Sequence, residues 1–249
     1  MKEALLHTQR EVPFNNFSNI LEEAKEDVPP GLGGDCVVQA DHLEKGLKER
    51  GYTPRRVRAV NSRHVALVCN SEEGEPYYLD PFLLHDDPIS LGQAFGERSM
   101  VEVGAKPVVS GRPTKVIIRG MELDCFEVAS LGYREGEGEY LPSWRALYSL
   151  RQSGIDDGSK PWGVPTLITL RVAEDAGGVL NIKKKVGSSQ NEFFIGRVGE
   201  RHVKVTELDA NEEARKYMDA ISRAVKVEAK SVLEKIQIAV DICMIKLGA

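Results

Sequence analysis

The spacing of the apolar residues changes at Gly51, and this change restricts the chain to folds that join a helical part to a sheet. Before Gly51, apolar residues recur at steps of three and four, at Val37, Ala40, Leu43 and Leu47. This period predicts a helix that begins near Cys36 and ends at Gly51, a residue type that suits a helix C-cap. After Gly51 apolar and polar residues alternate, which predicts strands at 56–60, 63–68 and 76–80.

The rest of the chain uses the same two patterns. Residues 1–27 are helical in pattern with a break near Pro13, and residues from 211 onward are helical again. Between them, alternation predicts further strands at 115–119, 122–128, 166–172, 179–185, 193–198 and 202–208. Residues 132–139, where Gly and Glu alternate, predict a loop, and residues 153–163 predict a linker. We therefore expect an α+β protein in three pieces, at 1–52, 53–160 and 161–249.

The charge balance bears on the class of partner. Charged residues make up 29% of the chain and the formal net charge is −5. A protein that holds nucleic acid by its phosphates needs a surplus of basic side chains on one face. We interpret the run Lys183-Lys184-Lys185 as a solvated face or edge of a strand, so the sequence predicts no nucleic-acid partner.

The length of the apolar runs and the spacing of the cysteines predict the cellular compartment of the protein. No run approaches the roughly 18 apolar residues that span a bilayer. Residues 1–11 carry His, Gln, Arg and Glu, which do not form the apolar core of a signal peptide. We therefore expect a cytoplasmic protein without a membrane partner, whose four cysteines are reduced thiols. No two cysteines have the close spacing of zinc ligands, so we expect no metal, and we interpret His85-Asp86-Asp87 as a polar turn.

Cys36 is the first candidate for chemistry. It follows Gly33 and Gly34 and would be the first residue of a helix, with Asp35 as a suitable N-cap. Unpaired N–H groups at a helix start favour a thiolate. The two glycines leave room for a substrate carbonyl, and their N–H groups can hold an oxyanion. The alternative is a buried cysteine that packs as a small hydrophobe.

His64 and Asp80 are the second candidates. If strands 63–68 and 76–80 form an antiparallel hairpin centred on Glu72, His64 lies directly opposite Asp80 on one face. A carboxylate bonded to one imidazole nitrogen fixes the tautomer and leaves the other nitrogen for a thiol. Apolar residues share that face, which favours a buried pair over the alternative of a surface pair.

Several motifs in one order give the chain a resemblance to a known family. Residues 7–16 contain His7 and then Pro-Phe-Asn-Asn, residues 32–36 read Leu-Gly-Gly-Asp-Cys, and Gly-Tyr follows at 51–52. His-Val-Ala-Leu stands at 64–67 and Tyr-Tyr-Leu-Asp at 77–80. This pattern resembles the arylamine N-acetyltransferases over about residues 1–82, and Trp144 and Tyr148 resemble a later element of that family.

The resemblance implies a fold and an activity. The fold would be a helical domain carrying the nucleophile, a β-barrel-like domain carrying the histidine and aspartate, and a C-terminal strand-and-helix lid. Cys36, His64 and Asp80 would form a catalytic triad, with Phe14, Val65 and Phe82 as walls of the substrate pocket. The reaction would move an acyl group from acetyl-CoA or another acyl thioester to an amine, with no bound cofactor.

One departure from the family widens the choice of donor. The family has a glycine-containing segment after its aspartate, where this chain has Pro81-Phe82-Leu83-Leu84. Relatives of the family release a chain as an amide from a thioester, so the donor here can be larger or carried on another protein. Two alternatives stay open: a transglutaminase-like cysteine hydrolase or protease, and a non-catalytic relative that binds a partner.

Overall fold

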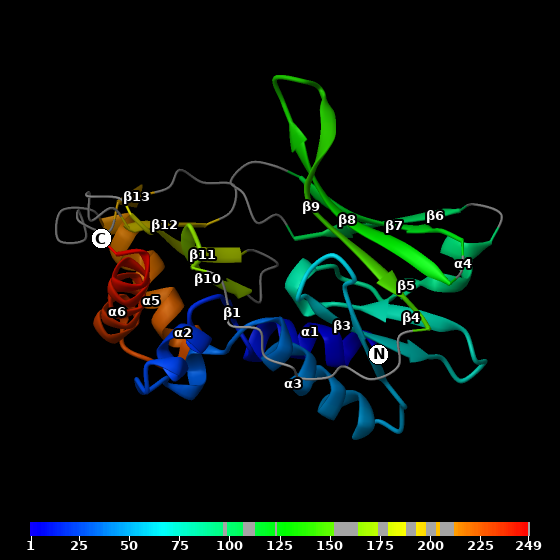
Figure 1. Cartoon of the computed structure of the whole chain (residues 1–249), viewed down its shortest axis with the longest axis horizontal. Coiled ribbons are helices and arrows are strands. Elements are labelled where there is room, and N and C mark those ends of the chain that lie inside the picture. Colours follow the sequence, from blue (N-terminus) through cyan, green and yellow to red (C-terminus); the bar gives the residue numbers. More distant parts are fainter. Residues whose placement is uncertain are drawn as a thin grey trace. The chain divides into compact units, whose positions relative to one another are not determined.

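The helix predicted from the apolar period before Gly51 is α3, Cys36–Lys48, in a computed structural model of the chain (Figure 1). The structure describes residues 1–96, 99–106, 113–122, 124–151, 164–173, 179–187, 193–197, 203–204 and 212–248. The chain forms two compact units. The first comprises Met1–Gln9 and Cys36–Gly158, and the second comprises Arg10–Asp35 and Ser159–Ala249.

In the first unit, α3 packs on the sheet whose strands β3, Val65–Asn70, and β4, Pro76–Leu79, lie next to the candidate residues His64 and Asp80. The sheet has the order β2-β3-β4-β5, with β2 Arg55–Arg58 and β5 Ile89–Ser90. Leu43 and Leu47 of α3 pack with Leu67 of β3 in one core, to which α1, Lys2–Glu11, contributes Leu5. The helix ends as predicted, because Gly51 has φ +82 and the Tyr52 N–H donates to the Leu47 carbonyl at 3.1 Å.

A second sheet of the first unit has the order β6-β7-β8-β9. Its strands are β6 Met100–Ala105, β7 Thr114–Gly120, β8 Cys125–Arg134 and β9 Glu139–Ser149, and α4, Leu91–Phe95, precedes it. Tyr78 of β4, Phe126 of β8 and Tyr148 of β9 share one core between the two sheets. No closed barrel is present: among the described residues, the strands of this unit form two antiparallel sheets.

The loop predicted at residues 132–139 is wrong in its extent. β8 and β9 stay paired out to Arg134 and Glu139, and together they form the long hairpin that is drawn in green in Figure 1. Contacts between partly buried side chains replace the apolar core there. The rings of Tyr133 and Tyr140 lie 5.2 Å apart, and the Lys115 ammonium lies 4.1 Å from the centre of the Tyr140 ring.

The second unit is a five-stranded antiparallel sheet with helices. The sheet order is β1-β10-β11-β12-β13, with β1 Phe14–Asn15, β10 Leu167–Ala173, β11 Val179–Lys185, β12 Phe193–Arg197 and β13 Val203–Lys204. Its core joins this sheet to α2 Ser18–Glu23, the 3-10 turn Pro30–Leu32, α5 Glu212–Val225 and α6 Ala229–Leu247. Residues 1–52 are therefore shared between the two units, and the predicted linker at 153–163 lies outside the described residues.

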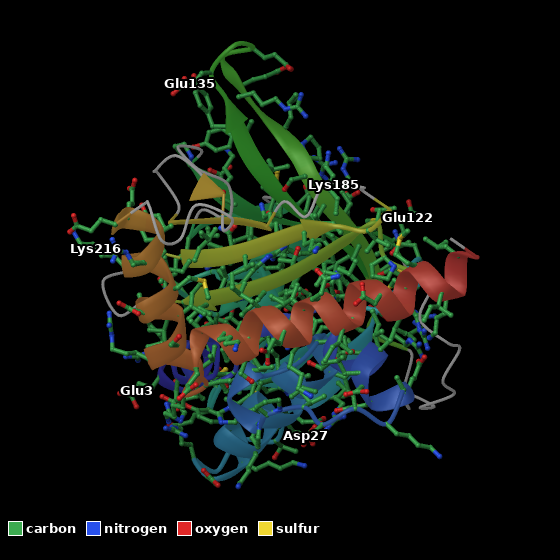
Figure 2. All side chains as sticks on the ribbon, turned by 90° about the vertical axis from the view of Figure 1, so that its left-hand side faces the viewer. Glu3, Asp27, Glu122, Glu135, Lys185 and Lys216 are labelled. Carbon is green, nitrogen blue, oxygen red and sulfur yellow. The ribbon has the colours of Figure 1, made fainter. Side chains whose placement is uncertain are left out.

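The interpretation of Lys183–Lys185 as a solvated run is wrong for its middle residue. These lysines end β11, which lies between β10 and β12. Lys184 is 2% exposed and its ammonium is bonded to Gln237 of α6, whereas Lys185 is exposed (Figure 2). Alternation along a central strand places neighbouring lysines on opposite faces.

The length and apolar character of the described helices decide whether any of them could cross a membrane. None of them combines the length and the apolar character that crossing a bilayer demands.

Candidate functional site

Cys36 opens α3 at a point where the preceding backbone is tightly packed. Gly33 has φ +70, and a Cβ on it would lie 2.1 Å from the Pro13 carbonyl oxygen, so only glycine fits. The Gly33 N–H donates to the Pro30 carbonyl and the Gly34 N–H donates to the Pro13 carbonyl, both at 3.2 Å. These two amides are therefore engaged in the backbone, in contrast to the oxyanion role that the sequence suggested for them.

The hairpin β3–β4 brings His64 and Asp80 together, as predicted, but in another register. Leu67 lies opposite Leu79, two residues away from the predicted register, which placed it opposite Tyr77. The turn is centred on Glu73, because the Ser71 N–H donates to the Glu75 carbonyl at 2.8 Å and Gly74 takes φ +86. A shift of two residues keeps every side chain on its face. His64 before β3 and Asp80 after β4 therefore still meet, with 2.7 Å between His64 Nε2 and Asp80 Oδ2.

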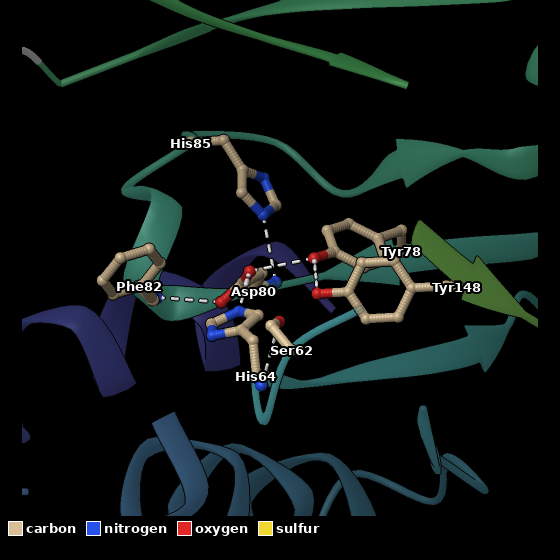
Figure 3. Close-up of polar contacts among 7 residues, drawn as sticks. All are labelled: Ser62, His64, Tyr78, Asp80, Phe82, His85 and Tyr148. Carbon is tan, nitrogen blue, oxygen red and sulfur yellow. Dashed lines mark hydrogen bonds and ion pairs between the residues drawn. The ribbon is translucent and has the colours of Figure 1, made fainter. Parts of the chain in front are cut away.

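Asp80 is a buried carboxylate with several donors (Figure 3). Oδ2 accepts hydrogen bonds from His64 Nε2 and from the Tyr78 hydroxyl at 2.9 Å, and Oδ1 accepts one from the Phe82 N–H at 3.1 Å. The Tyr78 and Tyr148 hydroxyls are 3.1 Å apart. Because the single proton of Tyr78 is donated to Asp80, Tyr148 supplies the proton of this second bond. Donors on both oxygens hold the carboxylate in a fixed orientation.

His64 links this carboxylate to the thiol. Its Nε2 faces Asp80, and the Cys36 side chain is near enough to its ring to contribute to the raised pKa of the imidazole. Burial by itself lowers the pKa of His64, but the charge of Asp80, its hydrogen bond and the Cys36 side chain outweigh burial and raise the pKa to about 10. The ring is therefore an imidazolium at neutral pH, which is the partner that stabilises a thiolate.

Two aromatic side chains enclose the His64 ring. Its centre lies 5.0 Å from the Phe82 ring and 5.0 Å from the Trp144 ring, and the latter pair is edge-on. Phe82 and Trp144 are themselves 5.7 Å apart. Both are only partly buried, so they reduce the access of water to the ring without closing it off.

The contacts that the structure gives for the other two predicted pocket residues do not include His64 or Asp80. Phe14 belongs to the second unit, where it pairs with Arg171 of β10 and its ring centre lies 5.2 Å from the guanidinium. Val65 is in the first unit but is buried in the core that β3 forms with α1 and α3. Their role as pocket walls stays a prediction.

Sequence analysis missed the role of His85, which it placed in a polar turn. The side chain is fully buried, and its Nε2 accepts a hydrogen bond from the Asp80 N–H at 3.0 Å. Its Nδ1 is 2.7 Å from the Asp87 carbonyl oxygen. The partner is a backbone amide, which no residue pattern reveals, so the sequence carried no signal for this contact.

Comparisons with known proteins leave the site to be interpreted from its geometry. No protein-family model matches the sequence, and no curated protein matches it with significance.

Proposed function

We propose that the protein is a cysteine-dependent acyltransferase that moves an acyl group from a thioester to an amine, as the arylamine N-acetyltransferases do. The observation that carries this proposal is the position of His64, which is bonded to Asp80 at 2.7 Å and has the Cys36 side chain near its ring. A buried thiol beside an imidazolium is a prepared nucleophile, and a thioester is the acyl donor that it attacks most readily.

The first half-reaction loads the acyl group onto Cys36. The thiolate attacks the carbonyl carbon of the donor, and the tetrahedral oxyanion is held by backbone N–H groups at the start of α3, among which we assign that of Cys36. The bond between the carbonyl carbon and the donor sulfur then breaks. The His64 imidazolium gives its proton to the departing thiolate and becomes neutral.

The second half-reaction transfers the acyl group from Cys36 to the amine. The amine attacks the thioester on Cys36 while neutral His64 takes one proton from the amine nitrogen. The bond between the acyl carbon and the Cys36 sulfur breaks, which releases an amide and regenerates the thiolate–imidazolium pair. Asp80 stabilises the imidazolium of the free enzyme and keeps neutral His64 oriented in the acyl-enzyme.

The donor is acetyl-CoA or another acyl thioester, including one on a carrier protein. Residues Pro81–Leu83 form a 3-10 turn directly after Asp80, and this turn places Phe82 against His64. An aromatic side chain in that place favours an apolar acyl group over a charged one. The proposal includes the family's three-part architecture, with the C-terminal strands and helices as the counterpart of its lid, and a cytoplasmic location.

Intact-protein mass spectrometry tests this function. The protein is incubated with acetyl-CoA and a series of longer acyl thioesters, and the matched control to Cys36→Ala is Cys69→Ala, which removes another buried thiol, on β3. The proposal predicts one added acyl group on the wild type and on Cys69→Ala, and none on Cys36→Ala. An adduct that persists on Cys36→Ala would contradict it.

A further inference from the structure

Asp80 has a second anchor besides its carboxylate, and this anchor belongs to its backbone. β4 ends at Leu79, so the Asp80 N–H lies past the last paired residue of the strand. The N–H is donated instead to His85 Nε2 at 3.0 Å, in the interior of the first unit (Figure 3). A buried amide without an acceptor is destabilising, so this contact has a structural reason to form.

The hydrogen bonds of His85 define its tautomer. Nε2 accepts a proton, so the ring proton sits on Nδ1 and is donated to the Asp87 carbonyl at 2.7 Å. His85 is therefore neutral. A second ring proton would point directly at the Asp80 N–H, and burial also lowers the pKa of the ring.

The rest of the first unit holds His85 in this place. Gln9 of α1 donates a hydrogen bond from Nε2 to the His85 carbonyl at 2.8 Å, and the His85 ring stacks on Tyr78 with an interplanar angle of 24°. Leu84 takes a left-handed conformation, φ +56, which directs the chain so that the next side chain returns toward Asp80. The Lys106 N–H donates to the Leu84 carbonyl at 3.0 Å and ties the same turn to the end of β6.

We propose that His85 is a positioning residue, which fixes the backbone of Asp80 and thereby aims its carboxylate at His64. Bonds from His64, Tyr78 and Phe82 reach the carboxylate oxygens, whereas the bond to His85 holds the main chain from which the carboxylate extends. Without it, residues 80–85 lose one of the contacts that close the turn, and the main chain of Asp80 can shift so that Oδ2 is aimed less well at His64 Nε2. This inference rests on the proposed function, since it assigns a role within that site.

Two substitutions separate positioning from simple packing. His85→Gln puts an amide oxygen near the place of Nε2 and keeps an acceptor for the Asp80 N–H. His85→Asn keeps a donor near the place of Nδ1 for the Asp87 carbonyl but does not reach Asp80. Gln9→Leu is a milder third variant, which loosens His85 from its carbonyl side and leaves the ring unchanged.

The readouts are the titration of His64, followed by nuclear magnetic resonance of protein labelled in its histidine nitrogens, and the rate at which iodoacetamide alkylates Cys36 at pH 7. We expect His85→Asn to shift the His64 titration downward by at least about one pH unit and to slow alkylation about tenfold, the effect of one lost hydrogen bond. His85→Gln should stay within about threefold of the wild type, and Gln9→Leu should fall between the two.

The outcomes distinguish the two proposals. If His85→Asn or Gln9→Leu is folded and His64 titrates as in the wild type, the positioning role is wrong while the proposed function stands. If the wild type itself titrates near the ordinary histidine pKa of about 6.5, the thiolate–imidazolium pair fails, and both proposals fail with it.

Discussion

Two buried histidines contact Asp80, one at its carboxylate and one at its backbone N–H, and they differ in charge. On the carboxylate side, His64 is 8% exposed, is bonded to Asp80 Oδ2, and has its pKa raised to about 10. On the backbone side, His85 is 0% exposed, accepts the Asp80 N–H, and has its pKa lowered by burial. Similar burial thus gives an imidazolium in one case and a neutral ring in the other. The atom that each ring faces decides its charge, and only the charged ring can stabilise a thiolate by its charge.

Asp80→Asn should produce the largest effect, because it removes the difference between the two sides. His64 then keeps its burial and loses its counter-charge, so its pKa should fall to or below about 6.5. Alkylation of Cys36 and acyl transfer should fall roughly a thousandfold or more, as when the aspartate of a catalytic triad is lost. Rates of alkylation by iodoacetamide at pH 7 measure this. A rate within tenfold of the wild type would mean that Asp80 does not set the state of His64.

The pH dependence of stability should differ in sign between the two histidines. The folded pKa of His64 is raised, so its contribution is complete below about pH 6.5 and is lost as pH rises toward about 10. The folded pKa of His85 is lowered, so its contribution is present above about pH 6.5 and is lost in acid. Urea unfolding from pH 4 to 10 measures both.

Two substitutions test which histidine causes the loss of stability at alkaline pH and which causes the loss in acid. His64→Gln should flatten the alkaline limb, whose size we expect to be on the order of a few kcal/mol, and His85→Gln should flatten the acid limb. A wild-type curve that is level from pH 6.5 to 10 would contradict the charge state given to His64.

A smaller effect is expected from the tyrosines that support the carboxylate. Tyr78→Phe removes one donor to Asp80 Oδ2 and also the hydroxyl to which Tyr148 is bonded. The free energy of unfolding should fall by about 1–3 kcal/mol, because a buried hydroxyl is left without that partner. Adding Tyr148→Phe should recover part of this loss, since both hydroxyls are then gone. Losses that simply add in the double variant would show that the two hydroxyls do not interact.

The smallest effect is expected from Asp87→Asn. The sequence His85-Asp86-Asp87 resembles a histidine beside its carboxylate, but His85 contacts the Asp87 carbonyl, and the Asp87 carboxylate forms an exposed ion pair with Lys2. Asp87→Asn should therefore change the free energy of unfolding by less than about 0.5 kcal/mol and leave the His64 titration in place. A larger change in that titration would mean that the carboxylate acts on the site.

The sequence predicted the helices and strands that contribute many buried residues to a core. The helix from Cys36 was found because its buried residues recur with a helical period, and the strands at 65–70 and 179–185 were found because most of their residues are buried. β9 was missed because most of its residues are exposed or partly exposed, and its Pro142 and Ser143 favour a loop. β6 was missed in the same way, since none of its residues is fully buried.

The sequence likewise predicted some contacts of the candidate site and missed others. His64 and Asp80 were predicted to meet, because the side chains of a hairpin keep their face even when the register is wrong by two residues. The contact of His85 with the Asp80 N–H was out of reach, since a buried amide past a strand end is a property of the backbone path. The engaged amides of Gly33 and Gly34 were missed for the same reason.

The most direct test of the central claim is to map which cysteine iodoacetamide alkylates first at pH 7 and low reagent concentration. Cys36 is buried, at 5% exposed, whereas Cys125 is partly exposed. Alkylation that followed exposure would reach Cys125 first, and alkylation that follows thiolate character reaches Cys36 first. The account predicts that peptide mapping finds the first adduct on Cys36, and that Asp80→Asn moves it to Cys125. A first adduct on Cys125 of the wild type would contradict a thiolate held by His64.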